Sequence, residues 1–292
     1  MKLRYMGDKI DPKRSSTSQI KYYVILIPLA IVYALLIIYI FSTALKPVTE
    51  LFEYPPKFFV QDPTGENFKD LISVLSSSTV PFGRYLLNSI VTTVIVVVFS
   101  VIISIYAAYT LAKKKFKGKA MLSNLNNMAM MFVPVAVTIP RFLVMQATGV
   151  LNTFWALVLP LIAMPVGLFL LQQFVSDVPD ELIEAARIDG ASENRIIWQI
   201  IVPIVSPALC TVAILAFQSA WNATEPSNLF VSSDLMRTFP YYISTLAANQ
   251  GNAVAGAGIV AAATLVLFIP NLVVFIIMQS RVMNTMAHSG IK

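Results

Sequence analysis

Long apolar runs separated by short polar segments dominate the sequence. A bilayer core about 30 Å thick needs roughly 20 apolar residues per helix, and six stretches meet this requirement. The pattern therefore predicts an all-α, polytopic membrane protein with six transmembrane helices. The predicted spans cover residues 22–43, 86–112, 121–146, 152–175, 204–222 and 254–280.

Prolines inside these runs predict kinks, because each proline removes one helical hydrogen bond. They are Pro134, Pro140, Pro160, Pro165, Pro207 and Pro270. The first run is read as an uncleaved span, since its apolar core, residues 24–41, is longer than the roughly 7 to 15 residues of a signal peptide.

The composition agrees with a membrane protein and excludes several kinds of site. Hydrophobic residues make up 57% of the chain and charged residues 12%, whereas soluble domains average about 45–50% and about 25%. The single cysteine, Cys210, excludes an internal disulfide and a multi-thiolate metal site. The single histidine, His288, excludes a histidine cluster.

Basic residues are distributed asymmetrically between the predicted loops. If the N-terminus is inside, fifteen of the 21 Lys and Arg residues face the cytoplasm and five face outside, with Arg141 left within the third span. The positive-inside rule then places both termini in the cytoplasm. This orientation predicts a basic N-terminus over residues 1–21, a transmembrane domain over 22–280 and a cytoplasmic tail over 281–292.

The net charge of +6 does not indicate a nucleic-acid partner, because the basic residues form short clusters between apolar runs. The densest cluster, KKKFKGK at residues 113–119, is interpreted as an orientation signal. A lipid-headgroup or partner site is the alternative.

The predicted cytoplasmic segment 177–203 is unlike the other loops, because it is long, acidic and patterned. It holds six of the fifteen carboxylates. Pro179, the acids that follow it and Gly190 are start and stop signals for a short helix, and Ser192 could cap a second helix. Leu182, Ala185, Ala186 and Asp189 share one helical stripe. The pattern predicts a helix-turn-helix elbow, although an ordinary interhelical connection remains the alternative.

This segment resembles the EAA signature of permease subunits of bacterial ATP-binding-cassette (ABC) importers. The resemblance rests on Glu184-Ala185-Ala186, on Gly190 after three intervening residues, and on Ile200 followed by Val202-Pro203, where valine replaces the usual leucine. The flanking EAARIDGAS is similar to the carbohydrate branch, in particular to the shorter maltose-transporter-type permease. Residues 139–160 and 237–243 also resemble sugar permeases.

The resemblance implies the type I permease fold of ABC importers and a divided machine. The expected partners are a second permease, two copies of a cytoplasmic ATPase subunit, an extracytoplasmic solute-binding protein, the lipid bilayer and a carbohydrate substrate. ATP and magnesium would be bound by the ATPases, which agrees with the lack of a G-x-x-x-x-G-K-[ST] loop in this chain. The residues that the resemblance assigns to ATPase coupling are Glu184, Ala185, Ala186, Asp189, Gly190, Ala191, Ile200 and Pro203.

Five further residues are candidates for a substrate pathway. An arginine within a span costs roughly 2.5 to 3.5 kcal/mol on insertion scales, so Arg141 should snorkel, form a structural hydrogen bond or line a pathway. Polar and aromatic groups at the outer end of the fifth span could bind a sugar or form an interfacial belt. They are Gln218, Trp221, Asn222 and Glu225.

Other functions fit the sequence less well. An ion-coupled secondary transporter would place ionisable residues near the midplane, and the predicted spans carry only Arg141. An intramembrane hydrolase would need a nucleophile with a base or a metal site within the bilayer. The single histidine, His288, lies in the predicted tail, so we do not expect an enzyme. An ABC permease for a non-sugar solute stays open.

The C-terminal tail resembles the extension that maltose-type permeases send between the two ATPases, but it could equally be a frayed end.

Overall fold

The computed structural model describes residues 20–76, 80–249 and 253–289, and every regular element in these ranges is a helix. The all-α prediction is therefore confirmed. Most of the predicted basic N-terminus, residues 1–21, and the last residues of the tail lie outside the described ranges. The backbone of the tail is helical as far as Ser289, because α15 continues to that residue.

The helices from the first half of the chain are α1 (Ile20–Leu45), α2 (Val48–Leu51), α3 (Glu66–Ser76), α4 (Phe82–Lys113), α5 (Lys119–Met131), η2 (Pro134–Val137) and α6 (Thr138–Ala147). The later helices are α7 (Trp155–Ile162), α8 (Pro165–Ser176), α9 (Asp180–Ile188), α10 (Glu193–Ile196), η3 (Ile197–Ile201), α11 (Val202–Ile204), α12 (Ser206–Trp221), α13 (Glu225–Leu229), η4 (Asp234–Met236), α14 (Phe239–Asn249) and α15 (Ala253–Ser289).

Three of the six predicted spans are single helices and three are broken. The continuous helices that are long and apolar enough to cross a membrane are Tyr22–Leu45, Phe82–Lys113 and Gly256–Gln279. The third and fourth runs form helix pairs bent by 112° and 42°, and the fifth run, mainly α12, meets the preceding helix Glu193–Ile204 at a bend of 87°. With each pair counted as one span, the described residues contain the six predicted crossings.

Prolines set the position of two of these breaks. Val133, directly before Pro134, has an extended backbone, and Met164, directly before Pro165, also leaves the helical region. The proline ring clashes with a helical conformation of the preceding residue, so the helix ends there. Pro160 and Pro270 instead lie inside continuous helices.

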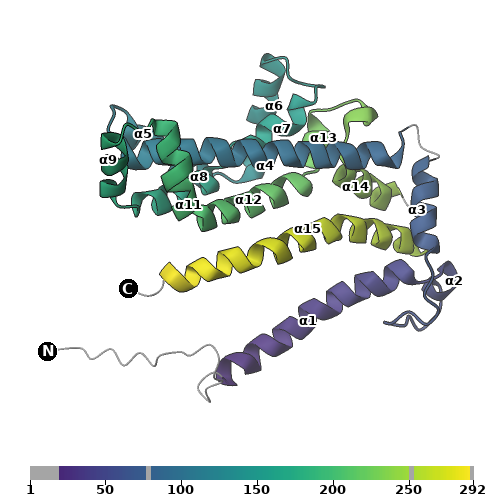
Figure 1. Ribbon diagram of the computed structural model, residues 1–292. Coiled ribbons are helices and arrows are strands. Elements are labelled where there is room, and N and C mark those ends of the chain that lie inside the picture. The colour runs from purple at the N-terminus through teal and green to yellow at the C-terminus, as the bar shows by residue number, and fades with distance from the viewer. Residues whose placement is uncertain (1–19, 77–79, 250–252, 290–292) are drawn as a thin grey trace.

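Helix α4 is the centre of the architecture (Figure 1). Helices α7, α8 and α12 pack along it, and α1 and α15 run side by side as a separate pair that reaches the rest through α12 and α14. Figure 1 also shows that the start of α1, the end of α15 and α9 all lie toward the same end of the molecule. The segment with α2 and α3 lies at the opposite end.

Two apolar cores lie at the two ends of α4. The core beside α9 contains Ile105 and Tyr109 of α4 together with Ile183, Ile196 and Ile201. The core at the other end is formed by residues of α1, α3, α4, α14 and α15, among them Ala44, Leu71, Tyr85, Phe239 and Ala262. Helix α4 therefore belongs to both cores.

At the end with α2 and α3, a buried asparagine connects three helices. The side-chain amide of Asn67 donates to the carbonyl oxygens of Ala44 (2.9 Å) and Lys46 (2.7 Å). Gly258 of α15 approaches so closely that a Cβ there would lie 2.4 Å from Asn67 Oδ1. Only a residue without a side chain fits at this position.

We predict that Gly258→Ala destabilises the protein, because Asn67 is held by two hydrogen bonds and cannot move aside. Overpacking of this kind costs about 1–3 kcal/mol. The melting temperature of the purified chain in detergent should fall for Gly258→Ala. Gly83→Ala in α4 is the matched control, since nothing lies within 4 Å of its added Cβ. Equal melting temperatures for the two variants would contradict the prediction.

Candidate functional site

Residues 177–203 form the predicted elbow, with α9 as its first helix and α10, η3 and α11 as its second. At the end of α9, Gly190 N donates to Arg187 O (3.0 Å) and Ala191 N donates to Ala186 O (2.9 Å). This pair of bonds is the Schellman motif, which requires a left-handed residue. Gly190 supplies it with a φ of +78°.

The second helix of the elbow begins with the expected cap and then widens. Ser192 Oγ accepts a hydrogen bond from Arg195 N, as predicted for an N-cap. Ile197–Ile201 follow as a π-helical turn. Such turns occur often at functional sites, and this one lies directly before Pro203.

One face of the elbow is buried and the other is free. Ile183, Ile196 and Ile201 are buried against α4, whereas Leu182 is 45% exposed and Ile188 is 86% exposed. Glu184 and Ala185 are also exposed, as is Pro203. A groove of about 280 Å³ between the two helices is lined by Ala186, Asp189, Ala191, Arg195, Gln199 and Ile200.

The structure brings four of the eight residues that the resemblance assigns to coupling to one groove, and Glu184, Ala185 and Pro203 are exposed outside its lining. Ala186, Asp189, Ala191 and Ile200 line the groove, and Gly190 makes the turn beside it. The exposed Ile188 was not predicted. Its signal in the sequence is an apolar residue beside the Asp-Gly turn, where an ordinary loop would be polar.

Four residues at the end of α4 hold the elbow in place, namely Tyr106, Tyr109, Lys113 and Lys114. Lys113 Nζ donates to Ser176 O (3.1 Å) and Val178 O (2.6 Å) and forms an ion pair with Asp180 (2.8 Å). This hydrogen-bonded ammonium lowers the pKa of the Asp180 carboxyl. Lys113 therefore fixes the joint where α8 passes into α9.

Glu193, the first residue of α10, is held from several directions. Tyr109 OH donates to Glu193 Oε2 (2.6 Å), and Lys114 forms an ion pair with the same carboxylate. Arg187 of α9 lies 3.4 Å from Glu193 Oε1 and also donates to Tyr109 OH. Both helices of the elbow are thus connected to α4 through a single carboxylate.

Tyr106 adds a second contact to α10 and η3. Its hydroxyl donates to Asn194 Oδ1 (2.9 Å) and accepts from Trp198 Nε1 (3.0 Å).

The sequence interpretation of KKKFKGK as an orientation signal missed the role of Lys113 and Lys114, because contacts between distant segments leave no local pattern.

Arg141 of α6 is paired with Glu225 of α13. Arg141 Nη1 lies 3.2 Å from Glu225 Oε1, and Thr138 Oγ1 donates to the same oxygen (3.3 Å). The side chains of both charged residues are about one-third exposed. Pairing offsets part of the cost of placing an arginine within a span, and it joins two of the predicted pathway residues.

The other predicted pathway residues have different environments. Gln218 and Asn222 are exposed on α12. Trp221 is buried, and its Nε1 donates to Leu267 O (2.9 Å) while its ring stacks on Phe217. The indole N–H is therefore used within the protein rather than offered to a solute.

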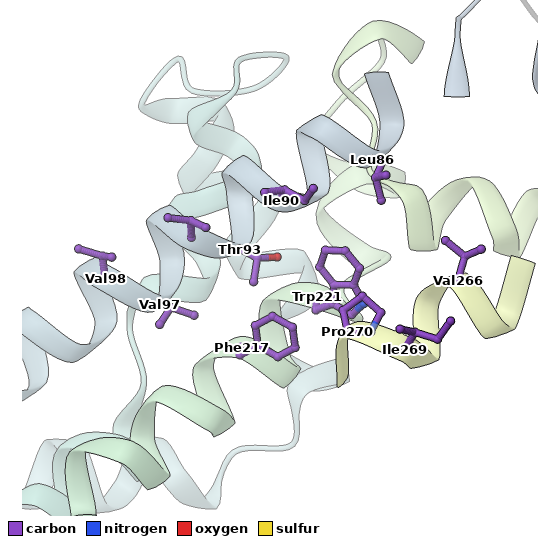
Figure 2. A pocket seen from close by; sticks show the side chains of 11 residues that line it. Leu86, Ile90, Thr93, Val97, Val98, Phe217, Trp221, Val266, Ile269 and Pro270 are labelled. Carbon is purple, nitrogen blue, oxygen red and sulfur yellow. The ribbon is translucent and has the colours of Figure 1, made fainter. Parts of the chain in front are cut away.

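Figure 2 shows the ring of Trp221 in the wall of a cavity between α4, α12 and α15. The cavity has a volume of about 580 Å³, and only the hydroxyl of Thr93 is polar among its lining side chains apart from the indole. Sugar sites need several convergent hydrogen-bonding groups, so this cavity does not fit a carbohydrate. In the described part of the chain, no group of three His, Cys, Asp or Glu residues could hold a metal ion.

Comparison with known proteins agrees with this architecture. The family model of the binding-protein-dependent transport system inner membrane component matches residues 100–280. The chain is 30% identical over 257 residues to the sulfoquinovosyl glycerol transport system permease protein SmoH of Agrobacterium fabrum, covering 87% of each protein. It is 30% identical over 276 residues to the trehalose transport system permease protein SugB of Mycobacterium tuberculosis, covering 93% of this chain and 97% of SugB.

A solved structure shows the same fold. A chain from a bacterial ABC transporter involved in the import of the acidic polysaccharide alginate superposes with a TM-score of 0.77 at 22% identity, over 91% of this chain and 98% of that chain. The fold is that of an ABC importer permease, which confirms the fold and the family predicted from the EAA residues. The chain thus belongs to the family of inner membrane components of binding-protein-dependent transport systems.

Proposed function

We propose that this chain is the permease subunit of an ATP-driven importer that moves a sugar or oligosaccharide across the cytoplasmic membrane. The observation that carries the proposal is the elbow, with its accessible groove and exposed Ile188 on a base anchored to α4. The carbohydrate class is supported by relatives named for sulfoquinovosyl glycerol, trehalose and diacetylchitobiose transport. The role of the chain is transport rather than catalysis.

The partners follow from this role. Two copies of a cytoplasmic ATPase subunit bind ATP and magnesium, and one of them contacts the elbow of this chain. A second permease completes the transmembrane pathway, and an extracytoplasmic solute-binding protein delivers the carbohydrate. One solved relative is a bacterial alginate ABC transporter in complex with an alginate-bound periplasmic protein, which supports the last of these partners.

The elbow is suited to ATPase docking for a physical reason. Small alanine and glycine residues allow a partner helix to approach closely, and Asp189 offers a carboxylate in the same groove, while Glu184 is exposed elsewhere on α9. The four anchoring residues on α4 hold this face in one conformation before binding. Preorganisation lowers the entropy cost of association, and it lets the elbow move as one body with α4.

In this proposal the exposed residues Gln218 and Asn222 and the ion pair of Arg141 with Glu225 contribute to the pathway. Exposed polar side chains within a span are costly toward lipid, so this face meets a partner subunit or an aqueous passage. Asn222 Oδ1 accepts from Asn271 of α15 (3.3 Å), and Gln218 lies one turn away. Trp221 supports this face from behind and does not contact the solute.

Both termini and the elbow lie in the cytoplasm in this proposal. The basic asymmetry supports it, and so does the position of the two described chain ends, which lie toward the same end of the molecule as α9 (Figure 1). In a Cys210→Ala background, Ile188→Cys should react with an impermeant thiol reagent only in inverted vesicles. Tyr54→Cys, at a position 92% exposed at the other end, should react in intact cells. The opposite pattern would reverse the orientation.

Docking of an ATPase to the elbow predicts a strong effect at Gly190. Valine is strained at a φ of +78°, at a cost of about 1–2 kcal/mol, and it should open the turn beside the groove. Gly190→Val should therefore reduce co-purification of the ATPase and uptake of solute while membrane insertion stays normal. Gly190→Asn is the matched control, because asparagine tolerates the left-handed conformation. If valine and asparagine behaved alike, the turn would have no role in docking.

The pathway assignment predicts that solute protects the exposed face of α12. In the reconstituted importer, Gln218→Cys and Asn222→Cys should react more slowly with a small thiol reagent when the transported sugar is present. Ala247→Cys on α14 is the control, since this exposed residue lies outside the assigned face. If the sugar did not slow thiol labelling at 218 and 222, or slowed it equally at 247, the pathway would not lie along this face of α12.

A further inference from the structure

Among the three continuous spans that the structure describes, α4 is the one without a proline. Its 32 residues, Phe82–Lys113, contain no proline, whereas α1 and α15 contain Pro28 and Pro270 and the remaining three spans are bent pairs. At 1.5 Å per residue it is about 48 Å long. An unbroken helix of this length transmits displacement better than a helix with a break.

One end of α4 is fastened to the elbow. Tyr109 and Lys114 hold Glu193, and Lys113 holds two carbonyl groups and Asp180. The core that contains Ile105 and Tyr109 surrounds these polar contacts. Displacement of the elbow by a docked ATPase would therefore displace this end of α4.

The other end of α4 is fastened to the segment 234–239. Asn88 Nδ2 donates to Leu235 O (2.9 Å) and Arg237 O (3.0 Å), and Ser89 Oγ accepts from Phe239 N (2.8 Å). Both polar side chains are less than one-tenth exposed. Every partner atom belongs to the backbone, so these bonds fix the path of the chain whatever side chains it carries.

The segment 234–239 is connected in turn to the predicted pathway. Thr238 N donates to Ser227 Oγ (3.1 Å), and the two hydroxyls of Thr238 and Ser227 are hydrogen-bonded at 2.9 Å. Ser227 is part of α13, the helix that carries Glu225. Glu225 forms the ion pair with Arg141. A continuous series of bonds therefore joins the elbow, α4, segment 234–239 and the ion pair.

We propose that Asn88 and Ser89 are positioning residues that make α4 a lever between the elbow and the opposite end of the molecule. ATPase-driven displacement of the elbow moves α4, and these two residues pass the movement to segment 234–239 and α13. The inference rests on the proposed function, because it needs an ATPase that acts on the elbow. The proposal assigns to α4 the transmission of displacement, which requires the contacts at both ends of the helix.

The test compares nucleotide responses at the two ends of α4 in the reconstituted importer. In the Cys210→Ala background, Ile188→Cys reports on the elbow and Leu235→Cys, at a position 54% exposed, reports on the far segment. The labelling rate at each position is measured without nucleotide and after turnover of ATP in the presence of vanadate, which traps ADP in the ATPase. We expect the rate to change at both positions when Asn88 and Ser89 are intact.

Asn88→Leu replaces the side-chain amide with an apolar branched side chain and removes both of its hydrogen bonds. Ser89→Ala is a milder second variant in case Asn88→Leu fails to assemble. Each should abolish the nucleotide response at 235 and preserve the response at 188. Asn127→Leu at an exposed position of α5 is the control and should preserve both responses.

Responses at 235 that persist in the Asn88 and Ser89 variants would overturn the lever. Loss of the nucleotide response at both 188 and 235 in Ser89→Ala would also overturn the lever, since the substitution would then have disturbed the whole structure rather than one connection. Absence of any response at 188 with Asn88 and Ser89 intact would instead contradict ATPase docking to the elbow, on which the lever depends.

Discussion

Backbone polar groups released at helix breaks must find partners, and this constraint organises much of the structure. In an apolar layer without water, each unsatisfied group costs several kcal/mol. Ser100 Oγ donates to Ile162 O (2.9 Å) at the break between α7 and α8, and Asn126 Nδ2 donates to Pro165 O (3.1 Å) across the same break. In the proline-containing α15, Leu267 O accepts from Trp221. At the break between α7 and α8, the neighbouring helices α4 and α5 therefore supply the donors.

Helix α4 supplies many of these groups because it has no break of its own. Its backbone hydrogen bonds are satisfied within the helix, so the polar side chains on its buried face can bind other segments. Asn88 and Ser89 serve one end, Ser100 the middle and Tyr109 the other end. These contacts account for the side chains of Asn88, Ser89, Ser100 and Tyr109 on this membrane span. They also connect the two apolar cores through one rigid element.

The elbow combines a fixed base with an accessible face, which is the combination that a docking element needs. The buried isoleucines and the contacts of Glu193 prevent it from rotating on α4. The glycine turn and small residues leave a groove on the opposite side. Lys113 and Lys114 of the 113–119 cluster take part in this base, so lysines that the sequence indicates only as an orientation signal also hold the elbow.

The sequence by itself determined the helical class, the six apolar runs, the cap at Ser192 and the turn at Gly190, because each depends on residues close together along the chain. The EAA residues also identified the family. The prolines predicted kinks, but only the tertiary structure showed which of them break a helix, that Trp221 is buried and that Arg141 pairs with Glu225. It alone joined Tyr109 to Glu193 and Asn88 to the 234–239 segment. These contacts link residues 84 and more than 140 positions apart, and such pairings depend on how helices pack rather than on any local periodicity.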